Sequence, residues 1–471
     1  MTAVEGSGDG IVERGLGRLR GRLEGVVLAG GAVHDEYTTN FGHIHFWRPR
    51  FLVKPAGPTD VLEVLKFARE EGLTVSTRGA AHSQSQLAIN RDGILLDMRS
   101  MNRILEVDPK GGTVLVEPGV VWRDLLARTM AAGLAPPVLT NNLSVTVGGT
   151  LSMAGIGIAS FEYGAQTDNV EELEVVTVDG VVRRCSRGHD PELFWGVLSG
   201  LGQVALILQA RLRLRRPKAT TRTYYLLYDD LRRFLEDAKA AMDAEKWDYL
   251  ESWCSPCPQG LKWVGGVRQP YAKWFFPFHL TAEFDAGFPP DDAAMLAGLE
   301  PYANLLVDDL PTQDFLNRLI PVFETWKRAG TWEHVHPWME VVLPWESATE
   351  YIEAVLADLP PGVQVGGHVL LWPARNAVSE VPLFMHPTTE YLIGFGILPA
   401  VPPKMWEAFR PKLDLASELA IAYGGKRYLS GYVNFTAEQW KAHYGEKWAG
   451  FAALKRKYDP EGRLNPGFIP F

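Results

Sequence analysis

Apolar side chains recur at three- and four-residue spacing in several stretches of the chain, as on the buried face of a helix. Over residues 61–71 they include Val61 and Leu65, and we expect Thr59 to be the N-cap because its hydroxyl can accept a first-turn N–H. The same spacing predicts further helices over residues 16–28, 121–133, 231–244 and 445–458.

Short runs of β-branched and other apolar residues alternate with these helices and predict strands. The predicted strands cover residues 73–77, 94–97, 104–108, 113–118, 170–178, 181–186, 204–213, 223–228 and 249–254. Asp179-Gly180 separates two of them and is typical of a two-residue hairpin. The mixture predicts an α+β fold. No G-x-G-x-x-G motif follows an N-terminal strand, which argues against a Rossmann dinucleotide domain.

A length of 471 residues is enough for two domains with buried cores. Arg215-Arg216-Pro217 marks the expected boundary between them, and residues 1–35 are interpreted as a flexible lead-in. The chain has 15 tryptophans, and they gather after residue 245. They indicate either aromatic walls around a site or core packing in the second half of the chain.

Composition excludes several classes of protein. The net charge of −9 argues against a nucleic-acid binder. We expect no membrane span, because no run of eighteen apolar residues occurs, and a cytoplasmic location, because the N-terminus lacks the pattern of a signal peptide. Cys254 and Cys257 have C-x-x-C spacing without a second ligand pair or a thioredoxin-like context, so we predict no metal site.

Two turns rich in small residues carry the clearest chemical signal. Residues 77–83 (T-R-G-A-A-H-S) follow a predicted strand and close on His82 and Ser83, and residues 147–152 (V-G-G-T-L-S) follow another. Small side chains allow successive backbone N–H groups to converge on an anion such as a pyrophosphate. A histidine at the edge of such a turn can tether a flavin ring covalently. The two turns together predict a flavoenzyme.

Several blocks of sequence, in order along the chain, match one flavoprotein family. They are R-G-A-A-H-S (78–83), V-G-G-T-L-S-M-A-G (147–155), D-P-E-L-F (190–194) with G-L-G-Q (200–203), H-P-W (336–338), and K-Y-D-P (457–460) with L-N-P-G (464–467). From about Asn40 to Phe471 the chain resembles cytokinin dehydrogenase, within the vanillyl-alcohol oxidase group.

The resemblance implies an FAD domain formed by residues 36–216 and completed by residues 424–471, with an α+β substrate domain inserted over residues 217–423. It also implies that FAD is bound covalently through His82, which holds the flavin and makes it a stronger oxidant. The residues assigned to the cofactor are His82, Arg78, Gly79, Ala80, Ala81, Ser83, Gln86, Thr146, Gly148, Gly149, Thr150, Ser152, Gly155, Ile207, Tyr428 and Asn465.

One departure from the family pattern affects catalysis. The family's catalytic aspartate lies in an L-T-D-Y-L segment, and the corresponding residues 139–143 are L-T-N-N-L, so Asn141 stands in its place. An amide cannot accept the substrate's proton, although it can orient a substrate by hydrogen bonding. A second glutamate of the family falls near His279, and Glu251 also resembles a family position. Asn141, Glu251 and His279 are therefore the candidate catalytic residues, whereas His336 is expected to be structural.

These features favour an FAD-dependent oxidoreductase that removes hydride from a C–N or C–O carbon of a small amine or alcohol, such as an intermediate of specialised metabolism, and is reoxidised by O2 or another acceptor. A weak cytokinin dehydrogenase, in which another group or water takes the proton, is the second hypothesis. A flavoprotein that uses its pocket for binding or for non-redox cyclisation is the third. The sequence does not indicate the oligomeric state.

Overall fold

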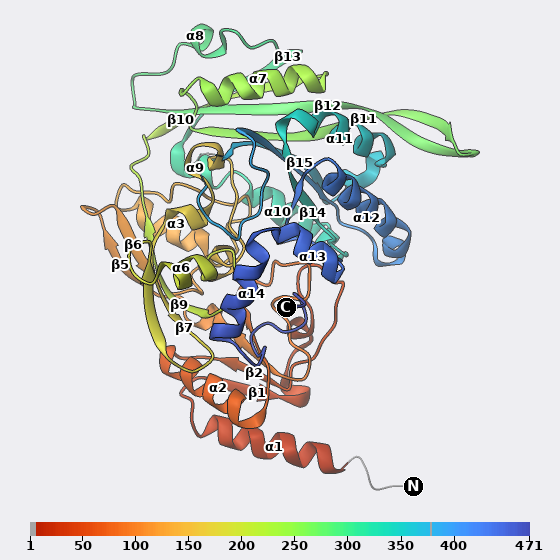
Figure 1. Ribbon diagram of the computed structural model, residues 1–471. Helices are drawn as coiled ribbons and strands as arrows, with labels where there is room; N and C mark the ends of the chain where they lie inside the picture. The colour runs from red at the N-terminus through yellow and green to blue at the C-terminus, as the bar shows by residue number, and fades with distance from the viewer. Residues whose placement is uncertain (1–5, 377–378) are drawn as a thin grey trace.

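A mixed four-stranded sheet forms the N-terminal end of the molecule (Figure 1). This computed structural model describes residues 6–376 and 379–471. The strand order is β1-β2-β4-β3, with bounds β1 (Val26–Ala29), β2 (Phe51–Lys54), β3 (Val75–Arg78) and β4 (Ile94–Asp97). Helices α1 (Gly6–Arg20) and α2 (Pro58–Glu71) contribute Leu19, Val64 and Phe67 to the core beneath this sheet. β1 pairs antiparallel with β2, and the other pairs are parallel.

A five-stranded antiparallel sheet follows along the chain. Its order is β5-β6-β9-β7-β8, with bounds β5 (Ile104–Asp108), β6 (Thr113–Val116), β7 (Val170–Val176), β8 (Val182–Ser186) and β9 (Leu206–Arg213). Helices α3 (Trp122–Met130), α6 (Pro191–Val197) and α14 (Lys447–Tyr458) share one core with this sheet, through Trp122, Phe194 and Phe451. The C-terminal helix α14 therefore packs with elements from the first half of the chain.

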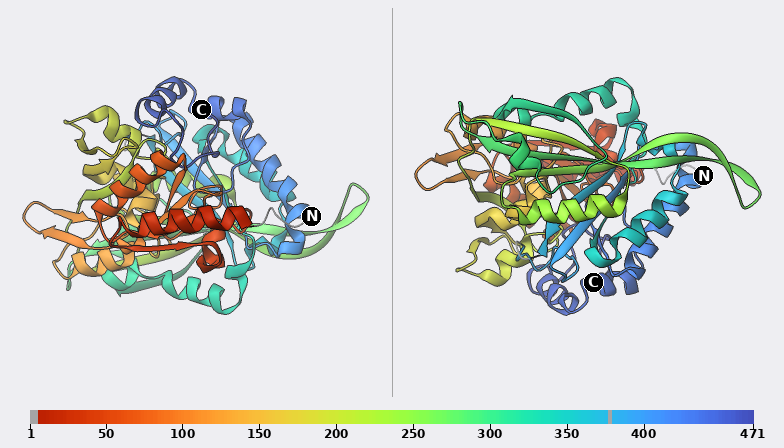
Figure 2. Two further views of the ribbon diagram at one scale, coloured as in Figure 1. Left: turned by 90° about the horizontal axis from the view of Figure 1, so that it is seen from below. Right: turned by 90° about the horizontal axis from the view of Figure 1, so that it is seen from above.

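An eight-stranded antiparallel sheet forms the second half. Its order is β13-β10-β12-β11-β15-β16-β14-β17, with bounds β10 (Thr220–Tyr228), β11 (Tyr249–Val264), β12 (Val267–Phe284), β13 (Ala303–Pro311), β14 (Met339–Pro344), β15 (His368–Arg375), β16 (Tyr391–Leu398) and β17 (Lys426–Tyr428). The β11–β12 hairpin extends past the body of the molecule (Figure 2). It turns at Gly265 and Gly266, whose φ angles of 55° and 79° suit a type I′ turn.

Helices cover one face of the large sheet and leave the other for the functional site. Figure 2 shows α7 (Leu231–Asp243), α11 (Trp345–Asp358) and α12 (Trp406–Ala422) across the covered face. Strand alternation places Val369 of β15 in that helix-covered core, whereas His368 and Leu370 line a cavity on the opposite side. The remaining α-helices are short: α4 (Val147–Leu151), α5 (Ser160–Tyr163), α8 (Asp292–Leu296), α9 (Thr312–Leu316), α10 (Ile320–Arg328) and α13 (Ala437–Tyr444).

The predicted α+β fold is confirmed, as are many element positions. The predicted strands 94–97 and 104–108 coincide with β4 and β5. The hairpin predicted at Asp179-Gly180 joins β7 and β8. Within residues 6–376 and 379–471, no helix combines the length and apolarity needed to cross a membrane.

Several local predictions are wrong. The helix predicted over residues 16–28 ends at Arg20, and residues 26–29 form β1 instead of a flexible lead-in. After the helix the chain pairs with β2, and Gly25 permits this close approach, because a Cβ there would lie 2.2 Å from the Lys54 carbonyl oxygen. The N-cap of α2 is Gly57, with Pro58 at the first helical position, and not Thr59. Residues 147–151, expected as a turn, form the short helix α4.

The C-terminal segment returns to the first sheet. The Val75 N–H donates to the Arg463 carbonyl (2.8 Å), and the Asn465 N–H donates to the Val75 carbonyl (2.9 Å). This parallel contact beside β3 places Asn465 next to the turn at Gly202, whose carbonyl accepts its side-chain amide (2.9 Å). The C-terminal segment, β3 and the turn at Gly202 thus lie side by side, although they are far apart in the sequence.

Candidate active site

One cavity of about 260 Å³ lies where the two smaller sheets meet the large one. It is lined on one side by residues from the segments 79–84, 145–153 and 201–207 together with Asn465, and on the other by residues of β11, β14 and β15. The next cavities among the described residues measure only about 20 Å³ each, so this one is the candidate active site.

The loop of residues 79–83 begins where β3 ends and is held from behind by Arg78. The buried Arg78 guanidinium donates to the carbonyls of Glu36 (2.7 Å), Thr39 (2.6 Å) and Ala88 (3.0 Å). Burial lowers the pKa of Arg78 to about 10, which leaves the group charged at neutral pH. Arg78 therefore shapes the loop without lining the cavity.

The two glycine-containing segments predicted from the sequence lie in contact. A Cβ on Gly79 would lie 2.1 Å from Thr146 Oγ1, and a Cβ on Gly148 would lie 2.7 Å from Pro118 Cβ. The Trp122 indole N–H donates to Thr150 Oγ1 (2.9 Å), which fixes α4 against the core. The absence of a side chain at Gly79 lets its backbone approach Thr146, and the absence of one at Gly148 lets α4 approach Pro118.

Several buried polar atoms in the wall have no hydrogen-bond partner in the described part of the chain. They are the Ser83 hydroxyl, the Gln84 side-chain carbonyl oxygen and the Trp338 indole N–H. Leaving such atoms unpaired in a folded protein costs free energy, so they indicate a polar ligand that fills this cavity. A large ligand with both hydrogen-bonding and aromatic parts, such as FAD, fits this combination of polar atoms and bare backbone.

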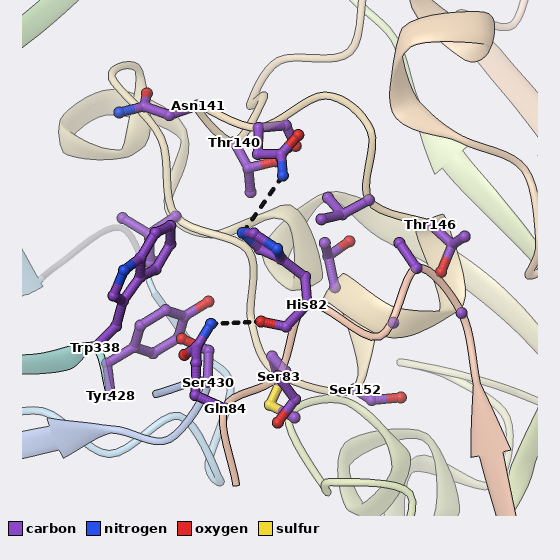
Figure 3. A pocket seen from close by; sticks show the side chains of 18 of the residues that line it. His82, Ser83, Gln84, Thr140, Asn141, Thr146, Ser152, Trp338, Tyr428 and Ser430 are labelled. Carbon is purple, nitrogen blue, oxygen red and sulfur yellow. Dashed lines mark hydrogen bonds between the residues drawn. The ribbon is translucent and has the colours of Figure 1, made fainter. Parts of the chain in front are cut away.

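His82 projects into the middle of this wall (Figure 3). The ring centroid lies 4.2 Å from that of Phe41 and 5.2 Å from that of Trp338. Burial lowers the pKa of His82 to about 4, so the imidazole is neutral at neutral pH. The Asn142 amide nitrogen lies 3.3 Å from Nε2, and because an amide nitrogen can only donate, Nε2 accepts.

Figure 3 places the labelled side chains around His82. Trp338, Tyr428 and Ser430 lie on one side of the imidazole, and Thr146 and Ser152 lie on the other. The Asn141 side chain points away from His82, although Asn141 lines the cavity.

Glu251 of β11 lines the opposite wall as half of an ion pair. The Arg318 guanidinium donates to both of its carboxylate oxygens, at 2.7 and 2.9 Å. Burial alone would raise the pKa of Glu251, but the charge and hydrogen bonds of Arg318 outweigh it and hold the pKa below its ordinary value. Glu251 is therefore ionised and already neutralised by its partner.

Two histidines lie near Glu251. His368 of β15 lines the cavity, and burial lowers its pKa to about 4. His279 faces Glu251 across the β11–β12 ladder, with its ring packed against Tyr225 (4.3 Å) and Trp253 (4.6 Å). His279 is not among the described residues that line the cavity.

A second buried carboxyl group, Glu340, lines the cavity from β14. It accepts a hydrogen bond from the Ser430 hydroxyl (3.2 Å). Burial raises the pKa of Glu340 to about 7, against the opposing effects of this hydrogen bond and of Arg427. Tyr428, whose phenol oxygen accepts the Gly155 N–H (3.1 Å), lies on the neighbouring strand β17.

Similarity to known families identifies the class of protein. The FAD binding domain family matches residues 49–186, and the family described as cytokinin dehydrogenase 1, FAD and cytokinin binding, matches residues 294–471. Cytokinin dehydrogenase 5 of Oryza sativa subsp. japonica is 30% identical over 92% of this chain and 88% of that protein. The chain belongs to the cytokinin dehydrogenase family. It is an FAD-dependent oxidoreductase.

Two further proteins are similar to this chain. An uncharacterized oxidoreductase, ORF5 in the fasciation locus of Rhodococcoides fascians, is 31% identical over 91% of this chain and 95% of that protein. The crystal structure of 6-hydroxy-D-nicotine oxidase from Arthrobacter nicotinovorans covers 94% of this chain with a TM-score of 0.70 and 21% identity, and 96% of that chain is covered. This structural likeness shows a shared vanillyl-alcohol-oxidase-type fold.

The cavity of the present chain brings together most of the site residues predicted from its sequence. Those that line it are Gly79, Ala80, Ala81, His82, Ser83, Asn141, Thr146, Gly148, Gly149, Thr150, Ser152, Ile207, Glu251, Tyr428 and Asn465. Four predicted residues, Arg78, Gln86, Gly155 and His279, are not among the described lining residues. Gly155 supports the site indirectly, through its hydrogen bond to Tyr428.

Sequence reasoning missed Gln84, His368, Ser430 and Glu340. Glu340 left a detectable signal, because it is a single acidic residue inside the otherwise apolar run Met339–Leu343, directly after the H-P-W motif. A charge in a buried strand is rare unless it is paired or functional. The other three lie in segments whose sequence gives no comparable signal.

Proposed function

We propose that this FAD-dependent oxidoreductase removes a hydride from a C–N or C–O carbon of a small amine or alcohol. The observation that carries the proposal is the cavity of about 260 Å³, bounded by the glycine-containing segments on one side and by a wall with carboxyl groups and aromatic rings on the other. Bound FAD supplies a two-electron acceptor, and O2 or another acceptor regenerates it.

The chain's own residues hold the cofactor and the substrate in this proposal. The backbones at Gly79 and Gly148 and the side chains of Ser83, Tyr428 and Asn465 hold FAD. His82 forms the covalent tether, since its neutral imidazole keeps a nucleophilic lone pair at neutral pH. Each of these residues is thus assigned a role in binding FAD.

The opposite wall orients the substrate and excludes water. Trp338, Trp372 and Leu370 provide apolar surface against a small ring or chain. Glu251, although neutralised by Arg318, can accept a further hydrogen bond, and the Asn141 amide can donate or accept one at the cavity edge. Asn141 cannot act as a base, so a different group must accept the substrate's proton.

Oxidation of a cytokinin is the second candidate, because residues 294–471 match the FAD and cytokinin binding family. In that case the protein acts as a weak cytokinin dehydrogenase. An Asn141→Asp variant separates the two candidates. A gain in turnover of isopentenyl-adenine would favour cytokinin oxidation, and no gain would favour a different amine or alcohol.

The test of the proposed function is a reductive titration. Oxygen-free protein is mixed with isopentenyl-adenine and then with a panel of small amines and alcohols, and the visible absorbance of the oxidised flavin is followed. We expect rapid bleaching by at least one compound. A flavin that dithionite reduces but that no compound bleaches would contradict the proposal and point to a non-redox role.

A further inference from the structure

Glu340 occupies a position suited to proton transfer. It lies on β14 between β16 and β17, opposite Gly396 and Tyr428, and its side chain reaches the cavity. The neighbouring residues Val341 and Met339 point to the helix-covered core. The backbone N–H of Gln84, in the loop that carries His82, donates to the Ser430 carbonyl (3.2 Å). Ser430 therefore connects Glu340 directly to the flavin-binding loop.

No cation within the described ranges forms an ion pair with the Glu340 carboxylate. Arg427 is the charged residue beside it, but its guanidinium donates to the Glu340 main-chain carbonyl (3.2 Å), to Ser417 Oγ (2.7 Å) and to the Tyr432 carbonyl (2.5 Å). Burial therefore dominates and raises the pKa of Glu340 to about 7. A general base is most effective when its pKa lies near the working pH.

The other polar groups in the cavity are less suited to this task. Glu251, the second carboxylate among the described lining residues, is neutralised by two hydrogen bonds from Arg318. Burial lowers the pKa of both His82 and His368 to about 4, which makes them weak bases. Tyr428 has a pKa raised above its ordinary value by burial and stays protonated.

We propose that Glu340 is the general base of this oxidoreductase and accepts the proton lost by the substrate's N–H or O–H group. The inference rests on the proposed function. Bound FAD would accept the hydride, the hydrogen with both bonding electrons, that leaves when the substrate's C–H bond breaks. The N–H or O–H bond breaks with its proton transferred to the Glu340 carboxylate, and a C=N or C=O bond forms. The Ser430 hydroxyl orients the carboxylate.

The test compares Glu340→Gln, Glu340→Asp and the matched control Glu353→Gln, which lies on the exposed side of α11. Bleaching of the flavin by the best compound of the panel is measured against pH. In the wild type the rate rises with pH up to about pH 7. Glu340→Gln lowers the rate by about 10²–10⁴-fold and loses this rise, whereas Glu340→Asp keeps it. Glu353→Gln matches the wild type.

A spectroscopic measurement tests the same group without turnover. Infrared difference spectra of the flavoprotein are recorded during a pH titration, and the stretching band of the protonated carboxyl group is followed. The wild type and Glu353→Gln show a carboxyl group that titrates near pH 7, and Glu340→Gln lacks it.

The outcomes distinguish the two proposals. If the wild type is bleached and Glu340→Gln is bleached equally fast with the same pH dependence, the base assignment is overturned and the proposed function stands. A band near pH 7 that survives in Glu340→Gln also overturns the base assignment. If no compound bleaches a flavin that dithionite reduces, the proposed function fails, and the assignment of Glu340 fails with it.

Discussion

At the scale of single residues, the burial of Glu340 links stability to pH. The folded protein binds the Glu340 proton more tightly than the unfolded chain does, because its pKa rises from 4.5 to about 7. Its contribution to stability is complete below about pH 4.5, decreases between the two pKa values, and is lost above about pH 7. The physical cause is burial of the carboxylate, which outweighs the hydrogen bond from Ser430 and the charge of Arg427.

This linkage gives a prediction for Glu340→Gln. Between about pH 5 and pH 8 the wild type should lose about 2–3 kcal/mol of unfolding free energy relative to Glu340→Gln, which lacks this titration. Denaturant unfolding of both proteins across this range measures the difference. Glu353→Gln serves as the control, and its unfolding free energy should change with pH as that of the wild type does. If the unfolding free energies of Glu340→Gln and the wild type change equally with pH, the pKa of Glu340 is not raised by folding.

The His82 tether is a second prediction at this scale. The wild type should keep its flavin after acid precipitation, because a covalent bond survives unfolding. His82→Ala should give a yellow protein that releases its flavin in acid or denaturant, and Ser83→Ala should retain the flavin like the wild type. The flavin content of the precipitate and the supernatant is measured. Release of all flavin by the wild type would refute a covalent bond.

At the scale of elements, the contact between the two glycine segments determines the shape of the cofactor wall. Gly79→Ala places a Cβ 2.1 Å from Thr146 Oγ1, so the segments must separate. We expect a loss of about 1–3 kcal/mol and a lower flavin content. Gly17→Ala in α1, where a Cβ meets nothing within 4 Å, should be neutral or slightly stabilising.

Thermal unfolding and the ratio of flavin to protein test this prediction. The double variant Gly79→Ala/Thr146→Ala removes the clashing hydroxyl and should recover part of the loss. A Gly79→Ala protein with normal stability and flavin content would mean that the two segments are not in fixed contact.

The sequence predicted correctly those strands and turns whose ends are determined by neighbouring residues in the chain. Strands β4 and β5 and the Asp179-Gly180 hairpin agree because alternation and turn chemistry act over a few residues. The break at Gly25 depends instead on Lys54 and Asp60, which come from another part of the chain. Strand β11 continues to Val264, well past the predicted Cys254, because its long pairing with β12 supports an exposed hairpin that lacks a buried apolar pattern.

At the scale of the whole molecule, the chain's C-terminal end is connected to the active site through one buried cation. The Lys455 ammonium lies 2.7 Å from the Asp459 carboxylate and donates to the carbonyls of Gln203 (3.1 Å) and Leu464 (2.8 Å). These contacts join α14, the turn at Gly202 and the segment that carries Asn465. The FAD-binding region thus depends on residues more than 250 positions apart.

Lys455→Met should therefore destabilise the protein and weaken flavin retention. Removing the cation leaves the buried Asp459 carboxylate with only the backbone N–H groups of Arg463 and Leu464 as partners, and we expect a loss of about 3–5 kcal/mol. Lys457→Met is the matched control, because its ion pair with Glu192 is exposed and worth at most about 1 kcal/mol. Chemical denaturation followed by flavin fluorescence compares them. Equal stability of the two variants would contradict this role of Lys455.

The sequence by itself determined the α+β fold and the class of FAD-dependent oxidoreductase, because short motifs of glycine, histidine and serine carry their chemistry locally. The sequence also predicts that Asn141, an amide, stands where the resemblance to the family implies an acid. Only the tertiary structure decided which acidic groups face the cavity and in which state. Glu251 is neutralised by Arg318, 67 residues away, whereas the described residues provide no ion-pair partner for the buried Glu340. Burial and ion pairing depend on residues that lie far apart in the sequence, so a local sequence pattern cannot reveal them.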